Sequence, residues 1–583
     1  MTRLLVPRRR PEALLLDARP GDVLLRPGEM PLPLPTVARV LDRYDLLPVA
    51  ERARIRDAVP RWLAALAATD AARRLERDGI SPVDLVAGER VPALLEGLRL
   101  GLLLARLREG TRRPEWVVGS PWPALGPALA GAAIPPERVT GRREPRWHLL
   151  LPALPRLGGL LGTIGRAPVS SPARPSPPAP GRVLLLEASR TRALGRELEE
   201  AGVPLARLVP RDENRYLPVP PSPVALDGEA WDRLLATIPP APPEMPGGPG
   251  FDPRRVLGAV LRDAFSLAAR RLGEALAWRE LLRELRPPAI VAGLPWQGDL
   301  RALAFAARSL DVPFVAVQDG VLGWAGIGAI LPPTAAFSWG PEGTRWFVAR
   351  GFPRDRVFEV GDPLLEPRKH RVFSIDPREA RRRLGLPPGR RVLLAGLANS
   401  SPHDVHAEED SPLAALAGIA RGIRDADGWV LAVKPHPRLP RVDGLARLAE
   451  ADRVLRGISA RLLPPATDIA LALAAADAWI SEGDTVTVEA IVAGRDVLAW
   501  RGGAAPCPCP DMAGNAVPSA ADPGELAGLL SRDRLPPANP ALLGGQVRRV
   551  ASPADALAHL APDIDSAYGP VCRTTCHQPP SVP

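Results

Sequence analysis

Short apolar runs that alternate with helical patterns are the feature that most constrains the fold of this chain. Between residues 285 and 500, runs rich in Val, Ile, Leu and Ala repeatedly precede stretches with helical spacing. These runs are too short for buried helices, and their β-branched residues favour strands. Strands and helices that alternate in this way form βαβ units with a parallel sheet. The sequence therefore predicts an α/β protein.

The alternation stops and restarts along the 583 residues, which predicts several domains. We expect an N-terminal α/β accessory domain at 1–165, a Pro/Ser linker at 166–181, doubly wound Rossmann-like domains at 182–363 and 364–535, and a Pro-rich tail at 536–583. Proline and serine mark the linker. In the accessory domain, the spacing also predicts a helix near 36–46.

Charge and composition limit the partners of this chain. The formal net charge of +10 suits anionic partners, namely nucleotide phosphates, acidic glycans or an anionic membrane face. Nucleic acid is not expected, because aromatic residues make up only 4% and no helix-turn-helix or zinc-finger spacing occurs. The N-terminus lacks a signal-peptide core, and no run of 18 apolar residues exists. We therefore expect a cytoplasmic location, and peripheral contact at the inner face of the plasma membrane stays open.

The four cysteines do not predict a metal centre. Cys507 and Cys509, then Cys572 and Cys576, lack a standard zinc spacing. A composite site with His577 stays open, but free thiols in a reducing cytoplasm are favoured. We therefore predict no metal and no cofactor.

One apolar run ends in a cationic group at the edge of a predicted central strand. Residues 429–434 are apolar up to Lys434, and Pro435 and Pro437 then stop the strand on either side of His436. Ligands bind at the carboxyl ends of strands in open α/β sheets. Lys434 is one of only two lysines in an arginine-rich chain, which favours a special task. Lys434, His436 and Pro437 are therefore candidate ligand contacts; the plainer interpretation is a chance lysine and a turn histidine.

A second polar motif follows a later predicted strand. Ser481, Gly483, Asp484 and Thr485 come before a helical pattern that contains Glu489. A helix that begins near Thr485 presents unpaired backbone N–H groups, which bind anions. Asp484 would oppose an anion unless it caps the helix or meets ribose hydroxyls, and Glu489 could hold the ribose. Plain capping by Ser481 and Asp484 remains the alternative.

A third polar motif carries the candidate base. Gln318, Asp319 and Gly320 follow an apolar run at 313–317. A carboxylate at the end of a strand can accept a proton from a hydroxyl within hydrogen-bond reach. Gly320 lets the backbone turn sharply below a ligand, and Gln318 is a supporting residue. If Asp319 is not the base, Glu482, Asp484 and His403 are the next candidates.

These motifs together resemble the bacterial surface-polysaccharide glycosyltransferases. The order that carries the resemblance is Val-Gln-Asp-Gly at 317–320, Trp-Gly at 339–340, Val-Gly-Asp-Pro at 360–363, Lys-Pro-His-Pro at 434–437 and Ser481-x-x-Asp-Thr-Val-x-x-Glu-Ala490. The group includes capsule synthesis proteins, CDP-glycerol glycerophosphotransferases and His-Pro-motif sialyltransferases. It covers about 285–500 and implies the GT-B architecture, in which two Rossmann-like domains face each other.

The resemblance also implies residue roles. The His-Pro element of these families binds the donor nucleotide, which falls on His436 and Pro437, and their serine/threonine element binds donor phosphate, which falls on Ser481, Asp484 and Thr485. Many relatives carry Gln-His-Gly where this chain has Gln-Asp-Gly at 318–320. Asp319 therefore either replaces the histidine as base, or a histidine-type base has been lost and the protein is impaired.

The predicted function is transfer of a sugar or glycosyl phosphate to a growing cell-surface polysaccharide. The donor would be a CMP-, CDP- or UDP-linked sugar, and the acceptor a glycan or lipid-linked glycan. No Asp-x-Asp triplet of the kind that metal-dependent transferases use is evident among the motifs that would line the cleft, so metal independence is expected. The alternatives are a sugar-nucleotide 2-epimerase of the same fold and a non-catalytic scaffold of a polysaccharide assembly complex.

Overall fold

The computed structural model describes most of the chain. The described residues are 3–6, 23–26, 39–42, 47–109, 116–119, 131–132, 139–140, 181–210, 216, 224–295, 298–320, 335–397, 412–437, 444–481, 483–502, 517–538 and 541–561. They form two compact units, one made of 1–58, 93–179 and 238–264, the other of 59–92, 180–237 and 265–583. Among the described residues, no helix has both the length and the hydropathy to cross a membrane.

The first unit contains a five-stranded parallel sheet. Its order is β3-β2-β1-β4-β5, with β1 at Arg3–Val6, β2 at Val23–Arg26, β3 at Arg39–Asp42, β4 at Trp116–Gly119 and β5 at Val139–Thr140. The helix expected near 36–46 is wrong, because β3 occupies that segment and pairs with β2. Parallel strand pairing outweighs the local helical spacing here.

Helices lie along the chain between β3 and β4 of this sheet. They are α3 at Val49–Ala67, α4 at Asp70–Arg73 and α5 at Pro82–Glu109. An additional N-terminal α/β region is thus confirmed, as the fold class predicted.

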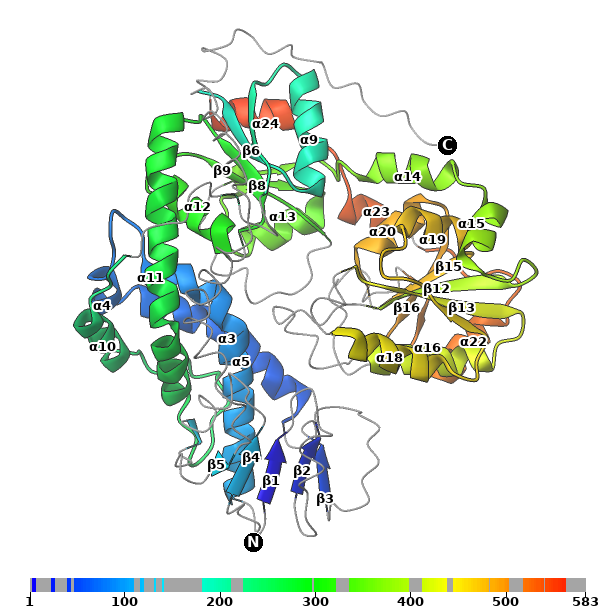
Figure 1. The fold of residues 1–583 in the computed structure, drawn as a ribbon, viewed down its shortest axis with the longest axis horizontal. Helices are drawn as coiled ribbons and strands as arrows, with labels where there is room; N and C mark the ends of the chain where they lie inside the picture. The colour runs from blue at the N-terminus through cyan, green and yellow to red at the C-terminus, as the bar shows by residue number, and fades with distance from the viewer. Residues whose placement is uncertain are drawn as a thin grey trace, which may run out of the picture. The chain divides into compact units, whose positions relative to one another are not determined.

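The second unit contains two six-stranded parallel sheets (Figure 1). The first has the order β11-β10-β9-β8-β6-β7, with β6 at Val183–Leu186, β7 at Leu205–Leu208, β8 at Ile290–Gly293, β9 at Phe314–Val317, β10 at Ala335–Ser338 and β11 at Val357–Glu359. Its helices are α9 at Ser189–Glu200, α10 at Gly228–Ala236, α11 at Pro253–Leu285, α12 at Gly298–Arg308 and α13 at Pro341–Val348, with a 3₁₀ turn, η3, at Arg354–Arg356. The strand order reverses between β6 and β8, and such a switch point is where ligands bind in open sheets.

The second sheet has the order β14-β13-β12-β15-β16-β17. Its strands are β12 at Arg391–Leu397, β13 at Trp429–Pro435, β14 at Ala460–Leu462, β15 at Ala478–Ser481, β16 at Asp496–Trp500 and β17 at Ser519–Ala520. Its helices are α14 at Leu365–Phe373, α15 at Pro377–Leu384, α16 at Pro412–Arg424, α18 at Gly444–Leu455, α19 at Ile469–Ala475, α20 at Thr485–Val492 and α22 at Pro523–Leu530. The switch point lies between β12 and β15.

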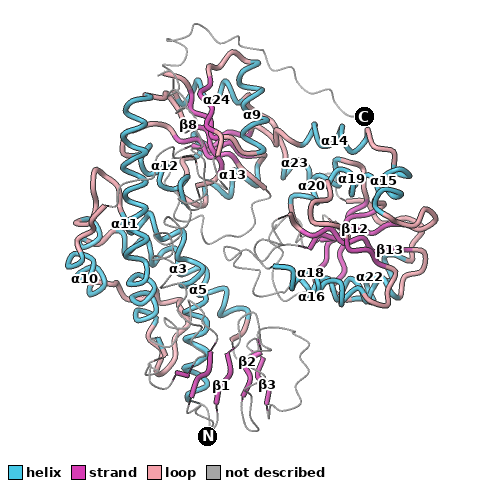
Figure 2. The backbone as a smooth tube through the Cα atoms, in the orientation of Figure 1, coloured by secondary structure: helices cyan, strands magenta, loops and turns pink. Residues whose placement is uncertain are grey.

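Alternating side chains explain why both sheets are covered on both faces (Figure 2). Successive residues of a strand point to opposite faces. In β6, Leu184 and Leu186 enter one apolar core and Val183 and Leu185 enter another. The strands of the second sheet divide in the same way between two cores. The continuous apolar runs of the sequence are therefore buried on both faces, and two doubly wound Rossmann-like domains of GT-B type are confirmed.

The segment predicted as a Pro-rich tail contains two helices, α23 at Ala541–Gln546 and α24 at Pro553–Leu560. The latter packs beside α9 (Figure 1), where Leu557 is fully buried in a core of the first Rossmann sheet. Residues after 561 lie outside the described part of the chain.

Two contacts hold the chain between α23 and α24 against the first Rossmann sheet. The Arg548 backbone N–H donates to the Trp339 carbonyl at 2.7 Å, and its guanidinium pairs with the buried Glu359 at 2.7 Å. A Cβ on Gly340 would lie 2.9 Å from the Arg548 nitrogen, so only glycine permits this approach. The Trp-Gly motif therefore seats the C-terminal segment.

Candidate functional site

A buried arginine organises the carboxyl edge of the first Rossmann sheet. Arg190 lies in the first turn of α9, directly after the switch-point strand β6, and its side chain is 8% exposed. Its Nη1 donates to the Asp319 carboxylate at 3.0 Å and to the Asp319 carbonyl at 2.8 Å. Its Nε donates to Asp362 at 3.3 Å, and its guanidinium carbon lies 4.6 Å from the Trp339 ring centroid. One cation thus joins the ends of β9, β10 and β11.

The two carboxylates on Arg190 differ in exposure. The Asp362 side chain is 1% exposed, and it also accepts a hydrogen bond from the Leu364 N–H at 3.0 Å. The Asp319 side chain is 64% exposed and follows β9. Asp362 is therefore a structural anchor, whereas Asp319 can meet a ligand in solvent.

Gln318 fixes the backbone around Asp319. Its side chain is buried; Oε1 accepts from the Trp339 N–H at 2.8 Å, and Nε2 donates to the Gly320 carbonyl at 2.8 Å. The Trp339 indole N–H donates to the Gln318 carbonyl at 3.1 Å. Gln318 thus holds the turn around Asp319 through buried hydrogen bonds, and the supporting role of Gln318 and Gly320 at a ligand site stays a prediction.

At the second Rossmann sheet, Asp484 caps helix α20, and Ser481 supports the cap through the Thr487 hydroxyl. Asp484 accepts from the Thr487 N–H at 2.9 Å, and the Thr487 hydroxyl in turn bonds Ser481 at 2.9 Å. The Gly483 N–H donates to the Ser481 hydroxyl at 3.1 Å. Burial raises the pKa of Asp484 above its ordinary value, and the hydrogen bonds from Thr487 oppose that shift. The local contacts match plain capping, and the donor-binding role of these residues stays a prediction.

Lys434 is not exposed at the strand end, contrary to the sequence-based expectation. It is 7% exposed, and its ammonium donates to the carbonyls of Pro435 at 2.9 Å and Pro465 at 3.3 Å. Burial lowers its pKa, while Asp468 opposes the shift. A loop distant in sequence covers this side chain. His436 is exposed, as expected for a ligand contact, and Pro437 is exposed beside it.

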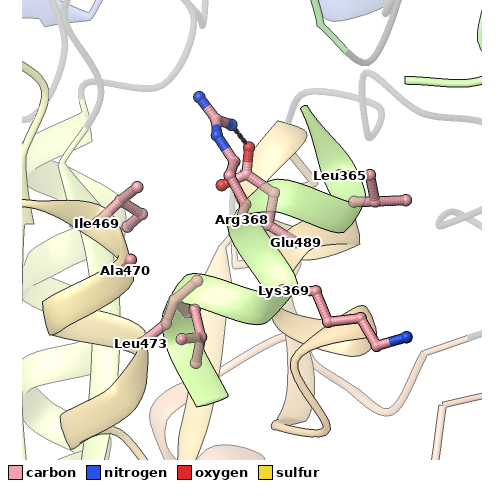
Figure 3. A pocket seen from close by; sticks show the side chains of 8 residues that line it. Leu365, Arg368, Lys369, Ile469, Ala470, Leu473 and Glu489 are labelled. Carbon is pink, nitrogen blue, oxygen red and sulfur yellow. Dashed lines mark ion pairs between the residues drawn. The ribbon is translucent and has the colours of Figure 1, made fainter. Parts of the chain in front are cut away.

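Glu489 points into a small pocket between α14, α19 and α20. The pocket is lined by Leu365, Arg368, Lys369, Val372, Ile469, Ala470, Leu473 and Glu489. Figure 3 shows the Arg368 guanidinium on the Glu489 carboxylate, with Lys369 directed away from them. Glu489 is 5% exposed. Its carboxylate therefore serves an ion pair in this structure, and the predicted ribose contact would have to replace that pair.

The edges of the two Rossmann sheets approach each other within the second unit. A Cβ built on Gly320 would lie 2.9 Å from the Thr485 hydroxyl. Burial lowers the pKa of Arg368, the charge of Arg190 lowers it further, and the charges of Asp362 and Asp319 oppose that shift. The residue after the candidate base is thus adjacent to the first residue of α20.

Sequence reasoning missed Arg190, Asp362 as its partner, and Arg368. Asp362 stood in a recognised motif, but in an arginine-rich sequence the residue type alone does not distinguish Arg190 or Arg368 from solvated arginines. The only available signal for Arg190 was its position at the first turn after an apolar strand. Glu482, His403 and the four cysteines lie outside the described residues. Among the described residues, no cluster of three or more His, Cys, Asp or Glu side chains could hold a metal.

Comparisons with known proteins give only low structural similarity. No protein-family model matches the chain, and no curated protein matches it. A putative UDP-N-acetylglucosamine 2-epimerase from Listeria monocytogenes is 15% identical, with a TM-score of 0.38, and the match covers 67% of this chain and 97% of that one. UDP-GlcNAc 2-epimerase from Neisseria meningitidis, bound to UDP-GlcNAc, is 12% identical, with a TM-score of 0.38 and coverage of 66% and 99%.

A glycosyltransferase from Rickettsia africae is also 12% identical, with a TM-score of 0.37 and coverage of 66% and 94%. These likenesses are low and include both epimerases and a transferase. The reaction of this chain therefore has to be inferred from its own residues.

Proposed function

We propose that this protein is a glycosyltransferase, or a glycosyl-phosphate transferase, that uses a nucleotide-activated sugar and acts on a cell-surface glycan. The observation that carries the proposal is the place of Asp319. It is an exposed carboxylate at the carboxyl edge of one Rossmann sheet, and Gly320 beside it adjoins the start of α20 in the other. This proximity supports the proposal that one substrate meets both Asp319 as base and the N-terminal end of α20 as phosphate contact.

In the proposed reaction, Asp319 accepts the proton of an acceptor hydroxyl. The acceptor oxygen then forms a bond to the anomeric carbon, or to phosphorus in the glycosyl-phosphate case. The bond to the nucleotide phosphate breaks, and the leaving nucleotide carries away the negative charge. In GT-B-type proteins, which the motifs resemble, the nucleotide would lie against the second Rossmann sheet, where His436 is exposed. The N-terminal end of α20, where the helix dipole is positive, would face its phosphate.

Charge supports an anionic substrate but does not identify it. The formal net charge is +10, and Arg190 and Arg368 both lie near Asp319. The epimerase and scaffold alternatives predict different products, so one assay separates all three.

The test is a panel of CMP-, CDP- and UDP-linked sugars, incubated with and without glycan or lipid-linked glycan acceptors. A transferase releases nucleotide only when the acceptor is present. An epimerase interconverts the donor sugar without an acceptor, and a scaffold changes neither. Acceptor-dependent release that is lost in Asp319→Asn supports the proposal; donor interconversion alone refutes it.

A further inference from the structure

We propose that Arg190 is a positioning residue, which holds the Asp319 carboxylate at the place where the acceptor hydroxyl is deprotonated. This inference rests on the proposed function, because Arg190 would position the base that the proposed reaction uses.

The first argument is the number of bonds from Arg190 to a single residue. Its Nη1 contacts both the carboxylate and the carbonyl of Asp319, at 3.0 and 2.8 Å. Two contacts to one residue restrict both the backbone and the side-chain torsions of Asp319. An exposed ion pair between two mobile side chains does not have this effect, because both partners remain free to rotate.

The second argument is that Arg190 is itself immobile. It is 8% exposed, its Nε contacts the buried Asp362, and its guanidinium packs over the Trp339 ring. Arginine has a planar, always charged donor group, so it can bind two carboxylates in fixed directions at once. The exposed carboxylate is therefore tied to a rigid part of the sheet, and positioning of this kind raises the rate of a proton transfer.

The third argument concerns charge. Arg190 pairs with both Asp362 and Asp319, so the three groups together carry one net negative charge. The buried carboxylate of Asp362 balances the cation, and the exposed carboxylate of Asp319 is the member of the set that can meet a ligand.

The experiment combines Arg190→Gln, Arg190→Lys, Asp319→Asn and the double variant Arg190→Gln/Asp319→Asn. Arg192→Gln is the matched control, because Arg192 lies on the same helix and pairs with Glu187 at 3.1 Å without contacting Asp319. Acceptor-dependent turnover and donor KM are measured for each, and the reactivity of Asp319 toward a carbodiimide is followed by mass spectrometry.

We expect Arg190→Gln to lower kcat about tenfold to a hundredfold with donor KM unchanged, since a misplacement of about 1 Å can cost that much. In the double variant, kcat should fall no lower than in Asp319→Asn, because Arg190 acts only through that carboxylate. Asp319 should also be labelled severalfold faster in Arg190→Gln and at the original rate in Arg192→Gln. Arg190→Lys should recover part of the turnover.

Losses that multiply in the double variant overturn the inference, and so does unchanged labelling of Asp319. If Arg190→Gln fails to fold because Asp362 is left unpaired, Arg190→Lys, which keeps the charge, is used in its place. Faster labelling of Asp319 and lower kcat in Arg190→Lys than in the wild type would then support the inference, and unchanged labelling and kcat would overturn it. Near-normal turnover in Asp319→Asn refutes the assigned base instead. If no donor gives turnover, the proposed function fails, and the labelling still decides whether Arg190 holds Asp319.

Discussion

Variants of Asp484 separate helix capping from ligand binding at α20. Its carboxylate accepts from the Thr487 N–H at 2.9 Å and from the Thr487 hydroxyl at 3.1 Å. Loss of an N-cap costs about 0.5–2 kcal/mol, whereas asparagine caps as well as aspartate. We therefore expect Asp484→Ala to lower the free energy of unfolding by about 1–2 kcal/mol, and Asp484→Asn to change it by less than about 0.5 kcal/mol.

The pH dependence gives a second measure of the same group. Folding raises the pKa of Asp484 above its ordinary value of 3.8. Between pH 3.8 and the raised pKa, the folded state therefore binds more protons than the unfolded state. The contribution of Asp484 to stability is therefore greatest below about pH 4 and declines as pH rises through the raised pKa. Relative to Asp484→Asn, the wild type should lose stability over that window.

The assay is urea unfolding at several pH values, together with calorimetry of UDP, CDP and CMP binding. Asp522 is a matched control, because it caps α22 of the same domain by accepting from the Glu525 N–H at 2.9 Å. Asp522→Ala should lose similar stability and keep nucleotide affinity. Unchanged stability of Asp484→Ala would refute the capping argument. A tenfold loss of nucleotide affinity in Asp484→Asn would instead indicate that the Asp484 carboxylate contacts the donor nucleotide.

Five further predictions concern other residues and the dependence of activity on metal. His436→Ala should weaken nucleotide binding about ten- to a hundredfold in calorimetry without unfolding, since one charge-assisted hydrogen bond contributes about 1.5–3 kcal/mol. Lys434→Ala should instead lower stability by about that amount in urea, because its ammonium bonds two carbonyls; unchanged stability would contradict the buried role. Asp319→Asn should reduce turnover about 10²- to 10⁴-fold with nucleotide affinity nearly unchanged, and full turnover would move the base elsewhere. Activity should persist in excess EDTA, because the Asp-x-Asp triplet at 425–427 precedes β13 and so lies at the opposite end of that strand from Lys434; loss that magnesium or manganese restores would count against this. Leu557→Ala should destabilise by about 2–5 kcal/mol in urea, and a smaller loss would contradict its place in the core.

Much of the fold was predictable because its strands are buried on both faces. The apolar run ending at Lys434 indicated a strand, and β13 occupies Trp429–Pro435. A strand that is buried on both faces is a continuous run of apolar residues, so the hydrophobic pattern of the sequence alone predicts it. The helix expected near 36–46 failed because a strand there is stabilised by pairing with β2, which local spacing does not reveal.

The site was less predictable, because its contacts join segments that are distant in sequence. Lys434 was expected to be exposed, but a carbonyl of Pro465 covers its ammonium. Arg190 contacts Asp319 and Asp362, which follow it by more than a hundred residues. Residue type and strand-end position made Asp319 a candidate base. Its contact with Arg190 is visible only in the folded structure, because the two residues are far apart in the sequence.

The return of α24 to the first Rossmann sheet has a consequence for synthesis of the chain. The ribosome makes β6 to β11 early, but Leu557 completes their core from near the other end of the chain. At about 5–20 residues per second, the delay is on the order of ten seconds or more. During that interval the nascent sheet carries an apolar face that includes Val183 and Val315. The growing polypeptide therefore offers an apolar surface to chaperones until α24 emerges, and a message shortened before α24 would leave that face uncovered.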